Sequence, residues 1–322
     1  MSSPSEPANS SSPLLAWLRL VRAPNVFTAI ADVMMGFVIV HGGLKPLAPL
    51  GLLVCLAAAS SLLYTAGMVL NDVFDIEVDA KERPFRPLPS GQIPLGLART
   101  MGFSMLACGV VMGALAGYAY PARLPWRSGL IAAVLAGCVL LYDGWLKRFA
   151  IGPLGMGLCR FFNVLLGMSV ALDVANGWPL GFGPMHLLPA AGIGAYIVGV
   201  TMFAKGEAGQ SSVPVLIGGM ITMGLGIGVL GWAAQFLERR QLSVGVFWLL
   251  LALLLFTVLR RCLMAVLTPD SKHVQAGVKN AIFSLVLFDA SVAMAAAPVS
   301  YSLAIAALLV PMFLLGRWVY ST

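Results

Sequence analysis

Charge is the property that this sequence of 322 residues has least of. Asp, Glu, Lys and Arg make up only 10% of the chain, whereas 59% of the residues are hydrophobic. Because soluble domains carry about 25% charged residues, this composition excludes a soluble globular protein. The apolar runs also lack the alternation of polar and apolar residues that the strands of a membrane barrel need. In lipid such runs must be helices, so the sequence predicts an all-α, polytopic transmembrane helical bundle.

Histidine and the common catalytic motifs are also scarce. The three histidines, His41, His186 and His273, are scattered and lack the spacing of a zinc site. Neither a phosphate-binding P-loop nor a Gly-x-Ser-x-Gly nucleophile motif is present. The five cysteines lie in or beside apolar runs without metal-like pairing, which predicts buried free thiols. These absences argue against a zinc enzyme, a P-loop NTPase and an α/β-hydrolase.

The apolar runs are long enough to cross a bilayer. Because Pro298 splits the end of the chain into two helices or one broken element, we expect nine or ten spans in a single domain over residues 14–322. Residues 1–13 are rich in Ser and Pro, lack the features of a cleavable signal peptide and predict a disordered tail. We expect spans near residues 23–41, 50–72, 97–119, 128–146, 152–173, 185–204, 213–236, 243–266, 279–297 and 301–318.

The excess of basic residues, a net charge of +7, follows the membrane topology. With the N-terminus in the cytoplasm, fifteen Lys and Arg residues fall on the cytoplasmic side and five on the other. This bias is typical of an integral membrane protein and needs no nucleic acid partner. We therefore expect a protein of the bacterial inner (plasma) membrane whose acidic motif, described next, faces the cytoplasm.

The run NDVFDIEVD, residues 71–79, follows directly after the second apolar run. On a continuous helix with about 100° per residue, Asp72, Asp75 and Asp79 fall within roughly a 60° arc, and Glu77 points to the opposite side. Converging carboxylates need a positive partner, and Mg²⁺ prefers oxygen ligands and phosphate. We predict that the three aspartates bind a metal. The alternative is a solvated acidic helix end, although acids at membrane depth are costly and usually functional.

The acidic run continues into RPFRPLPSG, residues 83–91. Together the two segments resemble the UbiA superfamily of intramembrane prenyltransferases, whose members carry an NDxxDxxxD motif and an RPLPSG-type loop. The resemblance implies a bundle that binds a prenyl diphosphate through Mg²⁺ and transfers the prenyl group to an aromatic or other lipophilic acceptor among the membrane lipids. It implies that Asp72 and Asp75 are catalytic, and that Asn71 and Arg83 contact the substrate.

Two polar residues mark the first span. Asn25 follows Arg22-Ala23-Pro24, which resembles the beginning of the family's first helix and implies that Asn25 contacts substrate in the cavity. A helix cap is the alternative for Asn25. Asp32 lies seven residues further, on the same helical face. An acid inside a span is a functional candidate, or it pairs with an inward arginine.

The segment after the fourth span, YDGWLKR, residues 142–148, resembles a family pattern of Tyr followed by Leu-Lys-Arg. We predict that Lys147 is catalytic, clamping the diphosphate, and that Arg148 binds substrate. Both residues would equally suit ordinary cytoplasmic anchors. Asp143 is not a feature expected from the family in general.

Arg160 and Asn163 lie on adjacent turns of the fifth span and on one face. We predict that both bind substrate. An arginine within an apolar helix needs an anion, which here is a substrate phosphate or a protein acid such as Asp143.

The sixth span departs from the family. A second acidic motif, Asp-x-x-x-Asp, is expected there, but the chain has Phe203 at the first position, Lys205 in between and Gly206-Glu207 at the end. We predict Glu207 as a metal ligand and Lys205 as a direct diphosphate contact, with a cytoplasmic anchor as the alternative for Lys205. The pattern resembles a divergent branch, that of the UbiA-like proteins of Ebo-type gene clusters.

Three functions follow from these features. The leading hypothesis is a Mg²⁺-dependent prenyltransferase. The altered second motif favours, as an alternative, a catalytically impaired component that binds or exports an isoprenoid or another small molecule. A secondary transporter is the third hypothesis, but the acids cluster with a basic loop at one mouth, and the sequence has no paired broken helices or internal repeat.

Overall fold

A computed structural model describes residues 12–44, 49–171, 175–205, 212–237 and 242–319, and within these ranges all regular structure is helical. This confirms the predicted all-α bundle. The α-helices are α1 (Pro13–Leu20), α2 (Ala23–His41), α3 (Leu50–Phe74), α4 (Ile76–Glu82), α5 (Leu95–Ala119), α6 (Trp126–Gly144), α7 (Gly152–Met168), α8 (Pro184–Ala204), α9 (Val213–Ala233), α10 (Val244–Leu267), α11 (Ser271–Ala296), α12 (Val299–Ala306) and α13 (Leu309–Val319). The 3₁₀ helices are η1 (Leu146–Arg148), η2 (Pro179–Gly181) and η3 (Ala234–Phe236).

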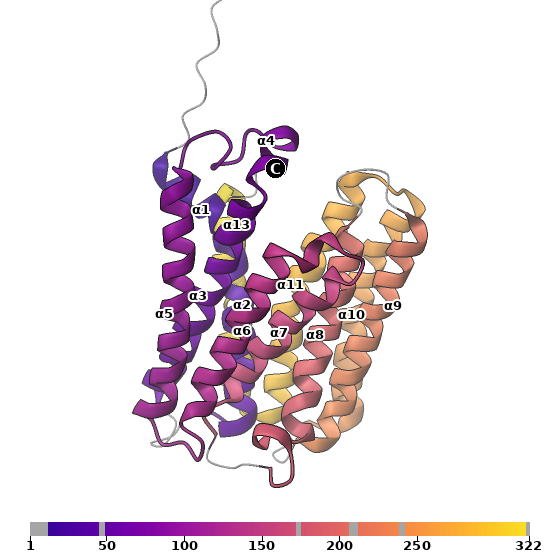
Figure 1. Cartoon of the computed structure of the whole chain (residues 1–322). Helices are drawn as coiled ribbons and strands as arrows, with labels where there is room; N and C mark the ends of the chain where they lie inside the picture. The colour runs from indigo at the N-terminus through magenta and orange to yellow at the C-terminus, as the bar shows by residue number, and fades with distance from the viewer. Residues whose placement is uncertain (1–11, 45–48, 172–174, 206–211, 238–241, 320–322) are drawn as a thin grey trace, which may run out of the picture.

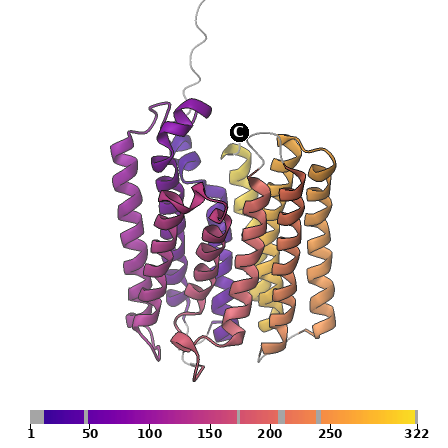
Figure 2. The ribbon, with the colours of Figure 1, turned by 45° about the vertical axis from the view of Figure 1, so that its right-hand side comes forward.

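The long helices stand side by side in one bundle (Figures 1 and 2). Helices α3, α5 and α6 form one side of it, and α8, α9 and α10 form the other. Helix α2 packs against α3, α7, α11 and α13. It therefore lies at the centre of the bundle and contacts helices from both the first and the last part of the sequence. Short α4 caps the end of the bundle at which α3 finishes (Figure 1).

The number of crossings follows from where the described ends lie. Among the described residues, nine helices are long and apolar enough to span a membrane, and the last of these combines α12 and α13. Helix α7, with 17 residues, lies between α6 and α8 as a further member of the bundle. Both α1 and the end of α13 lie at the α4 end of the bundle (Figure 1). A chain whose described ends lie on one side crosses the membrane an even number of times, so α7 must be counted as a crossing together with these nine helices. Pro298 separates α11 from a new helix rather than kinking one.

Glycine allows a close contact between α8 and α9. A Cβ atom on Gly199 would stand 2.6 Å from the carbonyl oxygen of Gly219, and one on Gly226 would stand 2.7 Å from that of Gly192. Any side chain at these positions would force the helices apart. Small residues at such contacts are how helices pack in lipid, where apolar burial gives little drive.

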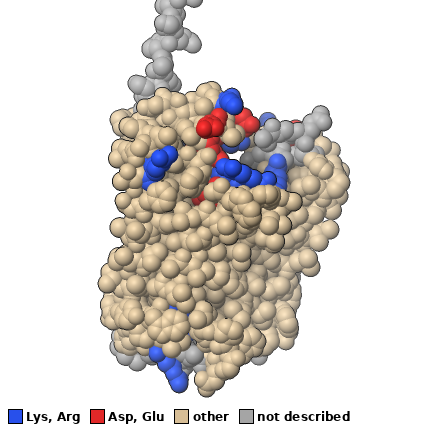
Figure 3. Space-filling view, in the orientation of Figure 1, with Lys and Arg blue, Asp and Glu red and all other residues tan. Residues whose placement is uncertain are grey.

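Charged side chains gather at the α4 end of the bundle. In Figure 3 acidic and basic groups lie together there, a broad band without charge follows, and a small basic group lies at the opposite end. The uncharged band matches the hydrocarbon core of a bilayer, so the protein is an integral membrane protein whose main charged face lies at one membrane surface.

Candidate active site

The acidic run spans the junction of two helices. Helix α3 ends at Phe74, Asp75 has a backbone ψ of 8°, and α4 begins at Ile76. The expectation of one continuous helix is therefore wrong, because the backbone leaves helical geometry at Asp75. The predicted faces nevertheless hold: Asp72 and Asp79 are buried, and Glu77 is exposed.

Arginines from two other segments lie between the buried acids. Nη1 of Arg86 lies 2.7 Å from Oδ2 of Asp79 and 3.5 Å from Oδ1 of Asp72. Nη2 of Arg22 lies 3.3 Å from the same Asp72 oxygen. Arg83, the arginine that the sequence singled out, is 3.9 Å from Asp79. Sequence reasoning missed Arg86, although it stands in the same RPFRPLPSG loop.

Arg22 reaches Asp72 from an unusual backbone conformation. Its φ of 47° and ψ of 50° are left-handed, a region that residues other than glycine occupy at a cost. Burial lowers the pKa of its guanidinium, but the carboxylates of Asp72, Asp143 and Asp79, together with Tyr64, outweigh burial and raise the pKa above its ordinary value. Arg22 is thus a permanent positive charge. It belongs to a cluster at the end of α3, here called the mouth, that consists of Asp72, Asp75, Asp79, Arg22, Arg86 and Lys147.

Lys147 closes the other side of the acidic run. It lies on η1, directly after α6, and its Nζ donates to Oδ2 of Asp75 at 2.7 Å and to Oδ1 of Asn71 at 3.1 Å. The structure therefore brings together three residues that the sequence predicted for one site. Arg148, also on η1, is exposed.

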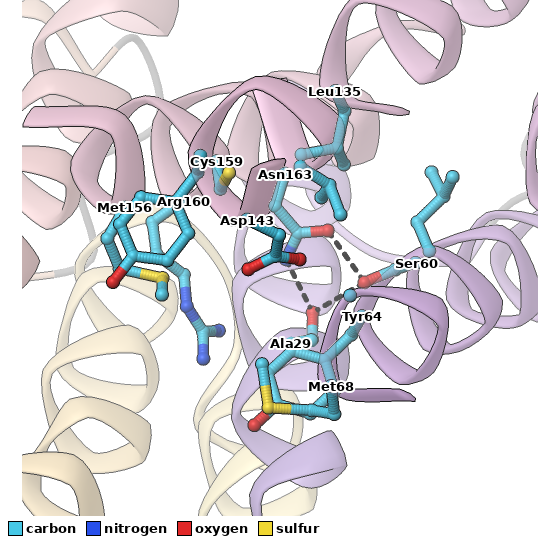
Figure 4. Close-up of a pocket in the computed structure, with 14 residues that line it drawn as sticks. Ala29, Ser60, Tyr64, Met68, Leu135, Asp143, Met156, Cys159, Arg160 and Asn163 are labelled. Carbon is cyan, nitrogen blue, oxygen red and sulfur yellow. Dashed lines mark hydrogen bonds between the residues drawn. The ribbon is translucent and has the colours of Figure 1, made fainter. Parts of the chain in front are cut away.

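A pocket lies next to this charged mouth, between α2, α3, α6 and α7 (Figure 4). Most of its wall is apolar, and its polar groups come from six side chains. The residues that line it are Ala29, Ser60, Leu63, Tyr64, Gly67, Met68, Leu135, Val139, Tyr142, Asp143, Met156, Cys159, Arg160 and Asn163.

Arg160 finds its anion within the protein. Its Nη1 lies 2.9 Å from Oδ2 of Asp32, and its Nη2 donates to Oγ1 of Thr28 at 2.7 Å. Nδ2 of Asn163 donates to the same Asp32 oxygen at 2.9 Å. Of the anions considered from the sequence, the structure selects an acid, but Asp32 rather than Asp143. Asn25, from the same helix as Asp32, interacts with the side chain of Tyr64 in the pocket wall.

The described sixth-span residues contact other parts of the bundle. Phe203 is fully buried, and a Cβ atom on Gly277 of α11 would stand 3.0 Å from its ring. Lys205 is exposed and donates to the carbonyl oxygens of Phe149 and Ala150 at 3.2 and 3.4 Å. Glu207 lies outside the described residues.

The oxygen donors of the mouth suit a hard divalent cation such as Mg²⁺. Within the described ranges, no group of three or more acidic, His or Cys side chains is already arranged around a metal position. Arg86 and Lys147 instead lie against the acids at 2.7 Å. The site fits a metal that arrives with an anionic ligand, because the same cations can then bind that ligand's oxygens. Phe203 contributes no metal donor.

Known proteins resemble this chain in sequence. The sequence profile of the UbiA prenyltransferase family matches residues 29–279. The digeranylgeranylglyceryl phosphate synthase of Sulfolobus acidocaldarius is 38% identical over 163 residues, 50% of this chain and 51% of that protein. The chloroplastic chlorophyll synthase of Avena sativa is 26% identical over 216 residues, 64% of this chain and 55% of that protein. The chain thus spans about half the length of the curated relatives it matches.

Solved structures share the fold. A UbiA homolog from Archaeoglobus fulgidus, bound to GPP and Mg²⁺, superposes with a TM-score of 0.62 at 12% identity, covering 91% of this chain and 99% of that one. The apo UbiA homolog from Aeropyrum pernix K1 gives a TM-score of 0.61 at 16% identity, covering 83% and 96%. With the family profile matching 251 consecutive residues, from 29 to 279, the chain belongs to the UbiA prenyltransferase family.

Proposed function

We propose that this protein transfers a prenyl group from a prenyl diphosphate to a lipophilic acceptor within the membrane, with Mg²⁺ as cofactor. The observation that carries the proposal is a mouth of paired acids and cations above a largely apolar pocket. The curated relatives named above are synthases of prenylated products, and a structural neighbour binds GPP and Mg²⁺. The same chemistry suits the residues of this chain.

The cations of the mouth would exchange partners when substrate binds. Arg22, Arg86 and Lys147 now pair with carboxylates. Bound Mg²⁺ would supply positive charge that makes the diphosphate a better leaving group. With Asp72 and Asp75 as its protein donors, the three cations would turn to diphosphate oxygens and stabilise the charge that develops as the bond to the prenyl carbon breaks. Asn71 and Asp79 would hold Lys147 and Arg86 in place.

The pocket would receive the prenyl chain. Its wall contains Leu63, Met68, Leu135 and Val139, so it offers an isoprenoid an apolar surface and excludes water from an allylic cation. The network of Arg160, Asn163 and Asp32 forms a fixed polar part of this wall, which would orient the acceptor rather than bind phosphate.

We further propose that the mouth faces the cytoplasm of a bacterium, at its inner membrane. Fifteen of the twenty Lys and Arg residues lie on that side of the predicted topology. This positive-inside bias is the support for the orientation.

The function is tested with purified protein and radiolabelled geranylgeranyl diphosphate, with and without Mg²⁺, scoring binding and product separately. We expect Asp75→Asn to abolish Mg²⁺-dependent binding, because it removes a carboxylate from the mouth. Glu77→Gln is the matched control, since Glu77 belongs to the same run but is exposed. Equal losses in the two variants would contradict the site. Binding without any product would favour a non-catalytic binder instead.

A further inference from the structure

One buried acid takes no part in the mouth or in the Arg160 network. Asp143 lies in the last turn of α6, is 3% exposed and lines the pocket. Figure 4 shows its carboxylate among Tyr64, Arg160 and Asn163. Across the residues that the structure describes, no hydrogen bond is donated to this carboxylate, whereas Asp32, Asp72, Asp75 and Asp79 each have a donor. An acid with spare acceptor capacity in a pocket is available to a ligand.

Asp143 lies one helical turn deeper than the mouth. It lies in the last turn of α6, before the break at Trp145 that leads to Lys147, and its Oδ2 would stand 3.9 Å from a Cβ atom on Gly67 of α3. Gly67 in turn precedes Asn71, the partner of Lys147, by four residues. One turn is about 5.4 Å along a helix. The carbon bonded to a diphosphate held at Lys147 would therefore lie near the level of Asp143.

Charged and titratable groups from every neighbouring element face Asp143. Burial opposes its negative charge, Lys147 of η1 and Arg22 before α2 favour it, and Asp75 and Asp72 of α3 oppose it. Tyr142 on its own helix, Tyr64 on α3, and Cys159 and Arg160 on α7 are further titratable or charged groups around it. A carboxylate in a pocket, without a hydrogen-bond donor of its own, is one of the groups that accept and release protons in catalysis.

We propose that Asp143 is the general base of the reaction and that the acceptor carries a hydroxyl group; this inference rests on the proposed function. The bond between the prenyl carbon and the diphosphate oxygen breaks, and its electron pair leaves with the diphosphate. The acceptor oxygen forms the new bond to the prenyl carbon. The proton of the acceptor hydroxyl passes to the Asp143 carboxylate, which later returns it to water at the mouth. Atoms and charge balance without any further reactant.

A different role for Asp143 would be that of a metal ligand in place of the missing Asp at position 203. The two roles differ in which step they serve. A base acts only on the acceptor, whereas a metal ligand also acts on diphosphate binding and bond breaking. The experiment therefore measures bond breaking and transfer separately.

The experiment uses full-length protein in lipid nanodiscs. The substrate is geranylgeranyl diphosphate labelled with ¹⁸O at the oxygen that joins the prenyl carbon to phosphorus. When the bond between the prenyl carbon and this oxygen breaks and re-forms without an acceptor, the label moves to the other oxygens of the same phosphate. Geranylgeranylglyceryl phosphate, a hydroxyl-bearing probe, reports transfer. The variants are Asp143→Asn, Asp143→Glu and the exposed control Glu77→Gln.

We expect Asp143→Asn to keep label exchange and its Mg²⁺ dependence within about twofold, while transfer falls by at least about 100-fold, the usual contribution of a general base. Asp143→Glu should recover part of the transfer. Parallel loss of exchange and transfer, or a raised Mg²⁺ requirement, would overturn the assignment in favour of a metal ligand or a structural role. If the wild-type protein shows label exchange but no transfer to the probe, both the hydroxyl-bearing acceptor and the role of Asp143 as general base would be overturned. Absence of both in the wild type would refute the proposed function itself.

Discussion

At the scale of single residues, the mouth pairs the carboxylates of Asp72, Asp75 and Asp79, of which Asp72 and Asp79 are buried, with nearby cations. Lys147 holds Asp75, Arg86 holds Asp79 and Arg22 holds Asp72. Such pairs satisfy buried acids, because an uncompensated charge at this depth is costly. On the proposed function they would also keep the cations close to the position of an incoming diphosphate. The same side chains would then serve both the ligand-free protein and the substrate complex that we propose.

Lys147→Ala should weaken binding of a prenyl diphosphate by about 10- to 100-fold, since a hydrogen bond to a charged group contributes about 1.5–3 kcal/mol. Equilibrium binding of radiolabelled geranylgeranyl diphosphate with Mg²⁺ measures this. Arg148→Ala is the matched control, because Arg148 lies on the same 3₁₀ helix but is exposed. A similar loss in both variants would show that general positive charge, rather than the Lys147 contact, binds the substrate.

Arg86→Gln should have opposite effects on the two ligands. Without Arg86 the acids Asp72 and Asp79 lose a competing cation, so Mg²⁺ alone should bind roughly tenfold more tightly, while the diphosphate loses a charged donor and binds more weakly. Titration calorimetry with Mg²⁺ and with the diphosphate separates these effects. Unchanged Mg²⁺ affinity would mean that Arg86 does not occupy the metal position.

The sequence predicted the acids and Lys147 because motif spacing survives a change in local backbone. It did not predict that Arg86 would bridge Asp72 and Asp79, since a loop arginine finds its partner only through tertiary folding. The partner of Arg160 was open for the same reason. Phe203 takes the position of the first Asp in the family's second motif, and its side chain packs toward α11. The sequence could not predict this partner, because it depends on how α8 is rotated in the bundle.

At the scale of elements, the junction between α3 and α4 and the contact between α8 and α9 shape the molecule. Periodicity in the sequence predicts where apolar helices lie, and each expected span has a helix in the structure. It does not predict a break such as that at Asp75, because the local sequence there contains neither Pro nor Gly. The partners of each helix also depend on surfaces that no single segment contains.

Gly226→Ala should destabilise the α8–α9 contact. The new methyl group would stand 2.5 Å from the backbone nitrogen of Tyr196, and overpacking of this kind costs about 1–3 kcal/mol. Thermal unfolding in detergent should show a lower Tm. Gly228→Ala, two residues further on α9, meets no atom within 4 Å and should leave the Tm equal or slightly higher. Equal Tm values for the two variants would contradict the close contact.

At the scale of the whole molecule, the orientation in the membrane is open to direct test. In a background without the five native cysteines, Ser90→Cys near the mouth should be protected from an impermeant thiol reagent in intact cells. Arg123→Cys, beyond the far end of α5, should react. Both positions are exposed, so access to the protein surface is matched. The reverse pattern would place the mouth on the outer side of the membrane.

The central position of α2 has a consequence for how the chain is made. Asp32 is fully buried, and its cation, Arg160, follows 128 residues later. At a synthesis rate of roughly 5–20 residues per second, the ribosome needs roughly 6–26 s to deliver that partner. During this interval the first spanning helix carries a carboxylate without its arginine, so it is poorly suited to enter lipid alone. In nascent chains that end before α7, α2 should therefore remain at the insertion machinery. In nascent chains that include Arg160, α2 should leave the machinery and enter the lipid.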